Sequence, residues 1–292
     1  MTDLLGQLRT WFAPREATLP DLPAPSETAP PATGSKPGLH QLAAGLAHGA
    51  PCSPALLEAL HALIHQRRVE AEVPDGPPSP KLTGLRVIRA DLPPWWAEGE
   101  NLLLAGEDVQ LPELRRNPYL APPRQAVVAL GRASAFNHFN LALDGSLVVL
   151  GDETTAQAGA LSCIGPSSIL VGEGTTCTNW AMLDCRNGGI IVTGADGMWA
   201  HGANLMSDDT HAIRDAATGR RLNTFGGRIV IDRHVWLCEQ VRVFDGARVG
   251  ANAVIGAGSL VKRGVIPPNT VAVGIPARPV RSGVTWSRED TP

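Results

Sequence analysis

Residues 231–266 decide the fold, and they read IDRHVW LCEQVR VFDGAR VGANAV IGAGSL VKRGVI, six consecutive blocks of six residues. Every block opens with an aliphatic residue, and these are Ile231, Leu237, Val243, Val249, Ile255 and Val261. Every block has a small or β-branched residue at its fifth place, and these are Val235, Val241, Ala247, Ala253, Ser259 and Val265. A period of six matches neither the 3.6-residue period of a helix nor the two-residue period of a strand.

This period predicts a β-helix built from hexapeptide repeats, in which each block is one short strand followed by a turn. Three blocks would close one triangular coil, and successive coils would stack about 4.8 Å apart, as parallel strands do. The aliphatic first residues would form ladders inside the coils, and the fifth residues would fill the rest of the core. We therefore predict a mainly β protein organised around a parallel β-helix.

Length and composition exclude several classes of protein. The 292 residues leave room for one or two domains and a sizeable core. The net charge of −3, without a long basic run, makes nucleic acid and anionic membranes poor partners. No apolar segment approaches the roughly 18 residues of a membrane-spanning helix, and the N-terminus lacks the layout of a signal peptide. The five cysteines are scattered without a CxxC pair, so we expect reduced thiols and a cytoplasmic location.

The chain before the repeats divides into three predicted parts. Residues 1–13 predict a short amphipathic helix that docks on its own protein or on a neighbouring subunit. Residues 14–38 are rich in proline and predict a flexible or extended linker. Residues 39–125 predict a mixed region with helices, one of which starts at the N-cap pair Ser53-Pro54 and ends near Arg67-Arg68. This region either helps to select a substrate or only caps the solenoid.

The pair Trp95-Trp96 has two interpretations, stacking on sugar rings or packing in a core or an interface. The β-helix domain is predicted over residues 126–281, followed by a C-terminal tail at 282–292. Its first coils are irregular, as terminal repeats commonly are, and an imperfect frame appears with Val171, Cys177 and Leu183. Between residues 206 and 224 the repeats stop, and this polar segment must loop out of the solenoid, where function often lies.

The excursion and the coils after it carry four motifs, which are SDDTHAIRDAATGRRLN, GGRIVIDRHVWL, IGAGSLV and PPNTVAVGIPARPVR. Together they resemble the hexapeptide-repeat O-acetyltransferases, including the galactoside and maltose enzymes, and the capsular-polysaccharide enzymes look closer still. The resemblance covers about residues 160–281. It implies a homotrimer of left-handed β-helices, an exception to the right-handed crossover rule. It also implies active sites between subunits, acetyl-CoA as the acetyl donor, a sugar or polysaccharide acceptor, and no required metal.

The resemblance places the catalytic histidine at His211, directly before Ala212-Ile213. A sugar hydroxyl must lose its proton as it attacks a thioester, and a neutral imidazole is a suitable base. The alternative is a solvated loop histidine. Asp209 matches the acidic residue of the loop and would either orient the ring or cap the turn. A covalent acetyl-cysteine route is disfavoured because no cysteine lies in the loop, although Cys238 is near enough to test by alkylation.

Three further residues are candidates for the acceptor and acetyl sites. Asn179 and Asp184 resemble the asparagine and aspartate that bind the acceptor sugar in the galactoside and maltose enzymes, but their spacing to the histidine is longer here. Trp236 lies where the polysaccharide enzymes carry a tryptophan beside the histidine. As the sixth residue of its block it points outward, where its indole can shape the acetyl pocket and donate a hydrogen bond to the oxyanion.

For coenzyme A, the resemblance implies a groove along the repeats lined by the backbone of Gly256, Ala257, Gly258 and Ser259. The phosphates would meet basic residues after the last coil, and the candidates are Lys262, Arg263, Arg278 and Arg281. One extra residue before Pro267-Pro268, relative to the family pattern, leaves open which of Lys262 and Arg263 reaches the nucleotide. Gly264 is the residue that would accommodate this insertion.

Three other functions stay open from the sequence. Transfer to an amine, as in amino-sugar N-acyltransferases or xenobiotic acetyltransferases, would use the same donor. A metal-dependent protein resembling the γ-type carbonic anhydrases needs three histidines, and the two positions five residues from His211 hold Met206 and Ala216. A non-catalytic scaffold would not bind acetyl-CoA.

Overall fold

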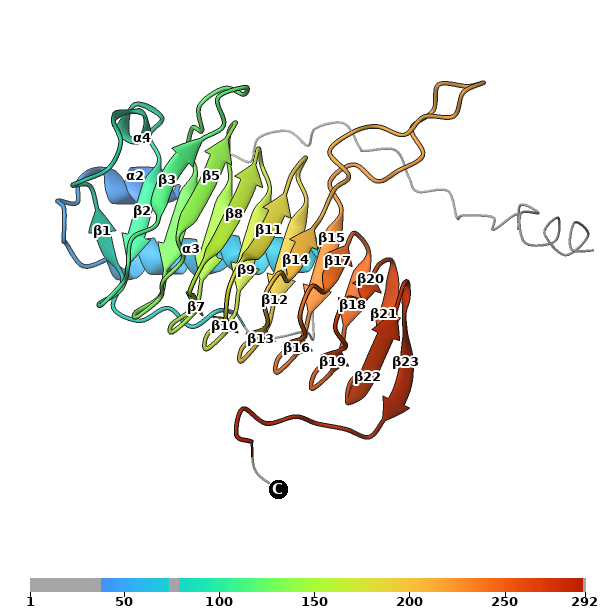
Figure 1. The fold of residues 1–292 in the computed structure, drawn as a ribbon. Coiled ribbons are helices and arrows are strands. Elements are labelled where there is room, and N and C mark those ends of the chain that lie inside the picture. The colour runs from blue at the N-terminus through green and yellow to red at the C-terminus, as the bar shows by residue number, and fades with distance from the viewer. Residues whose placement is uncertain (1–37, 74–78, 291–292) are drawn as a thin grey trace, which may run out of the picture. The chain divides into compact units, whose positions relative to one another are not determined.

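In a computed structural model of the chain, the structure describes residues 38–73 and 79–290. The expected helix at 1–13 and all but the last residue of the expected linker lie outside the described residues. The described chain forms three sheets that run side by side along one solenoid (Figure 1). All strand pairs are parallel except β1–β2 at one end and β22–β23 at the other, which are antiparallel.

The three sheets have nine, seven and seven strands. Sheet A contains β1 (Arg86–Ile88), β2 (Leu102–Ala105), β4 (Val127–Leu130), β6 (Leu147–Leu150), β9 (Ser168–Val171), β12 (Ile190–Thr193), β15 (Arg228–Ile231), β18 (Ala247–Val249) and β21 (Gly264–Ile266). Sheet B contains β7 (Thr155–Ala156), β10 (Thr176–Cys177), β13 (Met198–Trp199), β16 (Trp236–Leu237), β19 (Val254–Ile255), β22 (Thr270–Gly274) and β23 (Ala277–Ser282). Sheet C contains β3 (Glu113–Arg116), β5 (His138–Ala142), β8 (Gly159–Ile164), β11 (Ala181–Cys185), β14 (Asn204–Met206), β17 (Arg242–Phe244) and β20 (Leu260–Val261).

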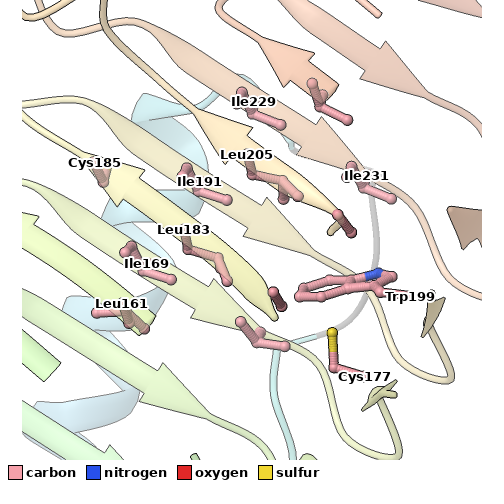
Figure 2. Close-up of a cluster of buried hydrophobic side chains, with 14 of the residues drawn as sticks. Leu161, Ile169, Cys177, Leu183, Cys185, Ile191, Trp199, Leu205, Ile229 and Ile231 are labelled. Atoms are coloured by element: carbon pink, nitrogen blue, oxygen red, sulfur yellow. The ribbon is translucent and has the colours of Figure 1, made fainter. Parts of the chain in front are cut away.

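The predicted ladders form the inside of the coils. Ile231 pairs with Val249 in sheet A, Leu237 with Ile255 in sheet B, and Val243 with Val261 in sheet C, and all six are at most 2% exposed. The imperfect frame at Val171, Cys177 and Leu183 is buried as well. Figure 2 shows Trp199 beside Cys177, among Leu183, Ile191 and Leu205. A mainly β fold that forms a hexapeptide-repeat β-helix is therefore confirmed.

The last block departs from the predicted frame. Val265, expected in the core, is 67% exposed, and the next residue, Ile266, is buried in the following ladder position. Ile266 pairs with Val249, and Gly264, with φ +142°, pairs with Ala247. The chain therefore reaches sheet A one residue earlier than the hexads require. A glycine at the shortened corner fits because a side chain would be strained at that φ.

Helix α3 (Pro54–Glu70) covers the outer face of sheet A (Figure 1). Ser53 caps its N-terminus by accepting a hydrogen bond from the Leu56 amide. Leu56, Leu60 and Ile64 are fully buried against the sheet, and each contributes about 1.5–3 kcal/mol of hydrophobic free energy. Because both faces of sheet A are buried, its strands read as continuous apolar runs such as LLLA and VVAL.

The remaining helices are α2 (Leu39–Ala44), which packs with α3, and α4 (Pro94–Glu98). Trp96 in α4 is 2% exposed and belongs to the interior cluster of the solenoid, so core packing accounts for it better than sugar stacking. The parallel pairing of sheet A begins at Leu102 in β2, before residue 126, where the domain was expected to start. Across residues 38–73 and 79–290 there is no helix with the length and apolarity that crossing a bilayer requires.

Candidate active site

An excursion interrupts the solenoid at the corner between sheets C and A. The chain leaves after Met206 in β14 and returns at Arg228 in β15 (Figure 1). The predicted loop at 206–224 falls almost entirely within it. Ile190 of the preceding coil still pairs with Arg228, so the two coils stack as if the loop were absent. The excursion is therefore free to carry function without disturbing the ladders.

The base of the excursion is closed by Asp208, which is 4% exposed. Its Oδ1 accepts a hydrogen bond from the Thr210 amide at 2.7 Å, and its Oδ2 accepts one from the Gly226 amide at 2.9 Å. The neighbouring Ser207 is fully buried, and its Oγ accepts a hydrogen bond from the Arg186 amide. The two ends of the excursion are thus joined to each other and to the preceding coil.

Asn223 holds the segment around the candidate base. Its Nδ2 donates to Asp209 Oδ2 at 2.9 Å and to the carbonyl oxygen of His211 at 2.8 Å, and its Oδ1 accepts from the Ile213 amide at 2.9 Å. The His211 backbone is therefore fixed, while its side chain is exposed. The carboxylate of Asp209 contacts Asn223, whereas the turn is capped by Asp208.

Beyond Asn223 the excursion is a small hairpin that projects from the solenoid. Leu222 donates to the carbonyl of Ile213, and Arg214 and Arg221 form an antiparallel bridge. Asp215 accepts hydrogen bonds from the hydroxyl and amide of Thr218, which lower the pKa of its carboxyl group. Three apolar side chains of the excursion are largely exposed, namely Ile213 (58%), Leu222 (53%) and Phe225 (64%).

The two candidate acceptor residues lie at opposite ends of β11. Asp184 is 8% exposed and pairs in register with Met206, at the root of the excursion. Its carboxylate binds the Arg186 guanidinium through two contacts of 2.5 and 2.6 Å, which raises the pKa of Arg186. Asn179 lies at the corner between sheets B and C and is exposed. The structure therefore brings Asp184 close to the excursion but not Asn179.

Trp236 is half-buried on the outer face of sheet B, in register with Met198 and Val254. No hydrogen bond from its Nε1–H is found within residues 38–73 and 79–290. The indole of Trp286 lies 6.1 Å away at 53°. Since His211 projects from the corner between sheets C and A, the described chain does not place Trp236 and His211 together.

The candidate coenzyme residues line the end of the solenoid. Residues 256–259 form the turn between β19 and β20. Gly256 is required by packing, because a Cβ there would meet Val273 at 2.6 Å. Ser259 is 1% exposed, and its Oγ accepts a hydrogen bond from the Gly274 amide. Ala257 and Gly258 are exposed.

The four basic candidates differ in what they contact. Arg263 Nη2 donates to Asp245 Oδ2 and to Thr224 Oγ1, both at 2.8 Å, so it ties the returning limb of the excursion. Arg278 donates to the carbonyl of Ala277. Lys262 is exposed, and its ammonium contacts no hydrogen-bond or ion-pair partner within the described ranges. Arg281 lies exposed on β23.

The five cysteines are all free thiols with raised pKa values. Burial raises the pKa of Cys52 to about 11 and the pKa values of Cys177 and Cys185 to about 12. Burial also raises the pKa of Cys163 and that of Cys238. Because the thiolate is the reactive form, these environments suppress nucleophilic thiols. In the described part of the chain, no three His, Cys, Asp or Glu side chains gather as a metal would require.

Sequence reasoning missed three features around the candidate site. Asp208 and Asn223 stand among other polar residues of the loop, and no spacing rule separates a side chain that bridges two backbone segments from a solvated one. The third is Trp286 in the tail, which the hexad frame does not reach. The sequence feature that could have pointed to Trp286 is a single tryptophan in an otherwise polar segment.

Comparison with known proteins defines the class. No protein-family model matches the chain. It is 47% identical over 81 residues to the putative lipopolysaccharide biosynthesis O-acetyl transferase WbbJ of Escherichia coli, covering 28% of this chain and 40% of that one. It is 47% identical over 53 residues to the galactoside O-acetyltransferase of Escherichia coli (18% and 26%). It is 29% identical over 152 residues to the polysialic acid O-acetyltransferase of Neisseria meningitidis (51% and 70%).

Solved structures agree on the fold. The polySia specific acetyltransferase NeuO matches with a TM-score of 0.59 and 22% identity, over 66% of this chain and 80% of that chain. The polysialic acid O-acetyltransferase OatWY matches with a TM-score of 0.50 and 22% identity, over 64% and 92%.

The fold and the excursion thus define a left-handed β-helix protein of the hexapeptide-repeat class. Within that class, the sequence matches confirm the resemblance to the O-acetyltransferases. The match to WbbJ spans only 40% of that relative, and the match to the galactoside enzyme only 26%.

Proposed function

We propose that the protein is an acetyl-CoA-dependent O-acetyltransferase that acts on a hydroxyl of a sugar or polysaccharide, with His211 as general base. The observation that carries this proposal is the fixed backbone and free side chain of His211. Asn223 and Asp208 hold the excursion, while the imidazole is exposed and unpaired within the described residues. A base needs such a placement, since its ring must reach a proton on another molecule.

The reaction proposed is direct transfer. His211 accepts the proton of the acceptor hydroxyl as its oxygen attacks the thioester carbonyl carbon. The resulting oxyanion accepts a hydrogen bond from the unpaired Nε1–H of Trp236, a donor of the kind that stabilises developing negative charge. The carbon–sulfur bond then breaks, the acetyl ester is released, and the proton on His211 passes to the departing thiolate. No cysteine is needed, which fits the raised thiol pKa values.

A homotrimer with sites between subunits follows as part of the proposal. His211 and Trp236 lie on different parts of the described chain, so a neighbouring subunit would have to supply one of them. Ile213, Leu222 and Phe225 offer apolar contacts on the projecting excursion. Exposed apolar side chains grouped in this way are typical of an interaction surface. The free thiols fit a reducing compartment, so the cytoplasm is the proposed location.

For the remaining site residues, the structure supports the predictions unevenly. Asp184 at the root of the excursion is the better-placed acceptor residue, and Asn179 stays a prediction. Lys262, with its free ammonium, is the proposed phosphate contact in preference to Arg263, which is engaged with Asp245. Gly256, Ala257, Gly258 and Ser259 would supply the groove, and Arg278 and Arg281 lie on the adjacent β23.

The test is an acceptor screen with the full chain and acetyl-CoA, following release of the free thiol. Hexoses, oligosaccharides, polysaccharides and amino sugars form the panel. His211→Ala should lower turnover by about 10²–10⁴-fold. His61→Ala, an exposed histidine on α3, is the matched control and should stay fully active. A fully active His211→Ala enzyme would overturn the assignment, and transfer to amines alone would replace O-acetylation by N-acetylation.

A further inference from the structure

The C-terminal tail returns along the corner between sheets A and B. Its first contact is with Asn269. The Asn269 Nδ2 donates to the carbonyl of Val284 at 3.1 Å, and the Asn269 carbonyl accepts from the Val284 amide at 3.0 Å. It then passes His234, two coils further back, and reaches Asp196 with Arg288. Trp286 is the one large apolar residue in this polar segment, and it is 9% exposed.

Trp286 contacts His234 through a ring stack and two hydrogen bonds. The two rings stack with centroids 4.0 Å apart and an interplanar angle of 4°. Trp286 Nε1 donates to the carbonyl of His234 at 2.9 Å, and the carbonyl of Trp286 lies 3.0 Å from His234 Nε2. His234 Nδ1 lies 2.6 Å from Asp196 Oδ2. The Asp196 carboxylate and the Trp286 carbonyl therefore hold the imidazole at both ring nitrogens, while its face lies parallel to the indole.

Arg288 holds the tail to the same coils through a second set of hydrogen bonds. Its guanidinium donates to Asp196 Oδ1 at 3.0 Å, to Thr176 Oγ1 at 2.7 Å and to the carbonyl of Gly197 at 3.0 Å. It also lies 5.7 Å from the centroid of a Trp286 ring. The carboxylate of Asp196 therefore binds both His234 and Arg288, and the Trp286 indole lies against both side chains.

The fixed indole lies beside Trp236, the residue expected to shape the acetyl pocket. Trp286 lies 6.1 Å from Trp236 at 53°, a tilted arrangement in the range that aromatic pairs favour. On sheet B, the register neighbours of Trp236 are the more flexible Met198 and the smaller Val254. Trp286 thus gives Trp236 a rigid flat neighbour, and the Trp236 Nε1–H stays free for a ligand.

We propose that Trp286 is a positioning residue for acetyl transfer, which fixes the indole of Trp236 in the orientation that meets the oxyanion. The inference rests on the proposed function, in which Trp236 Nε1–H stabilises that oxyanion. A small misplacement of such a donor is costly, since a shift of about 1 Å reduces rates by up to about 100-fold. Trp286 does not itself contact the reacting atoms.

The experiment is a double-mutant cycle on the full chain, with kcat and KM for acetyl-CoA measured for each variant. Trp286→Ala should lower kcat about tenfold and leave KM within about twofold, and Trp286→Phe should restore most of the rate. In a Trp236→Phe background, Trp286→Ala should have little further effect, because coupled residues are not additive. Thr285→Ala, an exposed neighbour in the tail, is the control and should match the parent enzyme.

A second readout does not depend on activity. With fluorotryptophan incorporated, the ¹⁹F resonance of Trp236, identified by its loss in Trp236→Phe, should shift or broaden in Arg288→Ala and in Trp286→Ala. An unchanged resonance, a wild-type kcat in Trp286→Ala, or strictly multiplicative effects in the double variant would each overturn the inference. His211→Ala is assayed alongside, so that a failure of the proposed function is recognised separately by its full activity.

Discussion

Asp208 and Gly226 join the two ends of the excursion, since the buried carboxylate of Asp208 accepts the Gly226 amide at 2.9 Å. Its second oxygen accepts the Thr210 amide at 2.7 Å, just before the candidate base. The loop that carries His211 is thus closed at its base by the Asp208 side chain, which is not part of the core ladders. Changes at its base should therefore affect the loop and leave the solenoid intact.

Asp208→Ala should open the excursion and reduce acetyl transfer. Two part-buried backbone amides lose their acceptor, and each lost hydrogen bond costs about 0.5–1.5 kcal/mol. Trypsin should cleave the loosened loop faster at Arg214, Arg220 and Arg221, while far-UV circular dichroism stays unchanged. Asp208→Asn keeps one acceptor oxygen, so its cleavage rate should fall between those of the parent protein and Asp208→Ala. Equal cleavage rates for all three proteins would contradict this role of Asp208.

Asn223→Asp should reduce kcat more than Asn223→Ala does. The alanine removes hydrogen bonds to Asp209, to the His211 carbonyl and from the Ile213 amide. The aspartate also places a second carboxylate beside Asp209, and like charges at that distance repel.

Exchanging the two side chains tests the Asn223–Asp209 contact directly. In the double variant Asp209→Asn, Asn223→Asp, a donor again faces an acceptor between these two side chains, while the hydrogen bond to the His211 carbonyl stays lost. A large part of the rate lost in Asn223→Asp should return, as measured by kcat with saturating acetyl-CoA. No recovery would show that the contact between these side chains does not hold the loop.

The ladders were predictable because they follow one rule repeated along the chain. Ile231, Leu237 and Val243 point inward for the same geometric reason, and each is confirmed by burial and register. The error came at Val265, where one corner is a residue shorter and Ile266 takes the core position. A hexad count cannot detect this change, because it depends on how tightly the chain turns at Gly264.

The candidate site was only partly predictable. His211 and Trp236 carry a motif, so a resemblance reaches them. Asp208, Asn223 and Trp286 act through contacts with distant backbone or with side chains in other coils, such as Trp286 with His234. Those contacts arise from the stacking of coils, and sequence distance gives no measure of it.

Alkylation of the native protein should leave acetyl transfer intact. Burial raises the pKa of every thiol, to about 11 for Cys52 and about 12 for Cys177 and Cys185. A raised pKa lowers the thiolate fraction at neutral pH, and reaction with iodoacetamide should be slow until the pH rises toward those values. Mass spectrometry after iodoacetamide treatment at pH 7.5, paired with the thiol-release assay, checks this.

Cys238 gives the most stringent test of this prediction, because it is half-buried on the same coil as Trp236. Cys238→Ser should keep kcat within about twofold, since direct transfer uses no thiol. A loss of about 100-fold or more in this variant would revive the acetyl-cysteine route.

Lys262 and Arg263 are adjacent in sequence and should have separate effects on kinetics. The ammonium of Lys262 is free, so Lys262→Ala should raise KM for acetyl-CoA roughly tenfold with little change in kcat, as expected for one lost phosphate contact. Arg263 instead binds Thr224 and Asp245. Arg263→Ala should therefore lower kcat by loosening the returning limb of the excursion, with KM for acetyl-CoA within about twofold. Steady-state kinetics of both variants decides between them, and the reverse pattern would assign the coenzyme contact to Arg263.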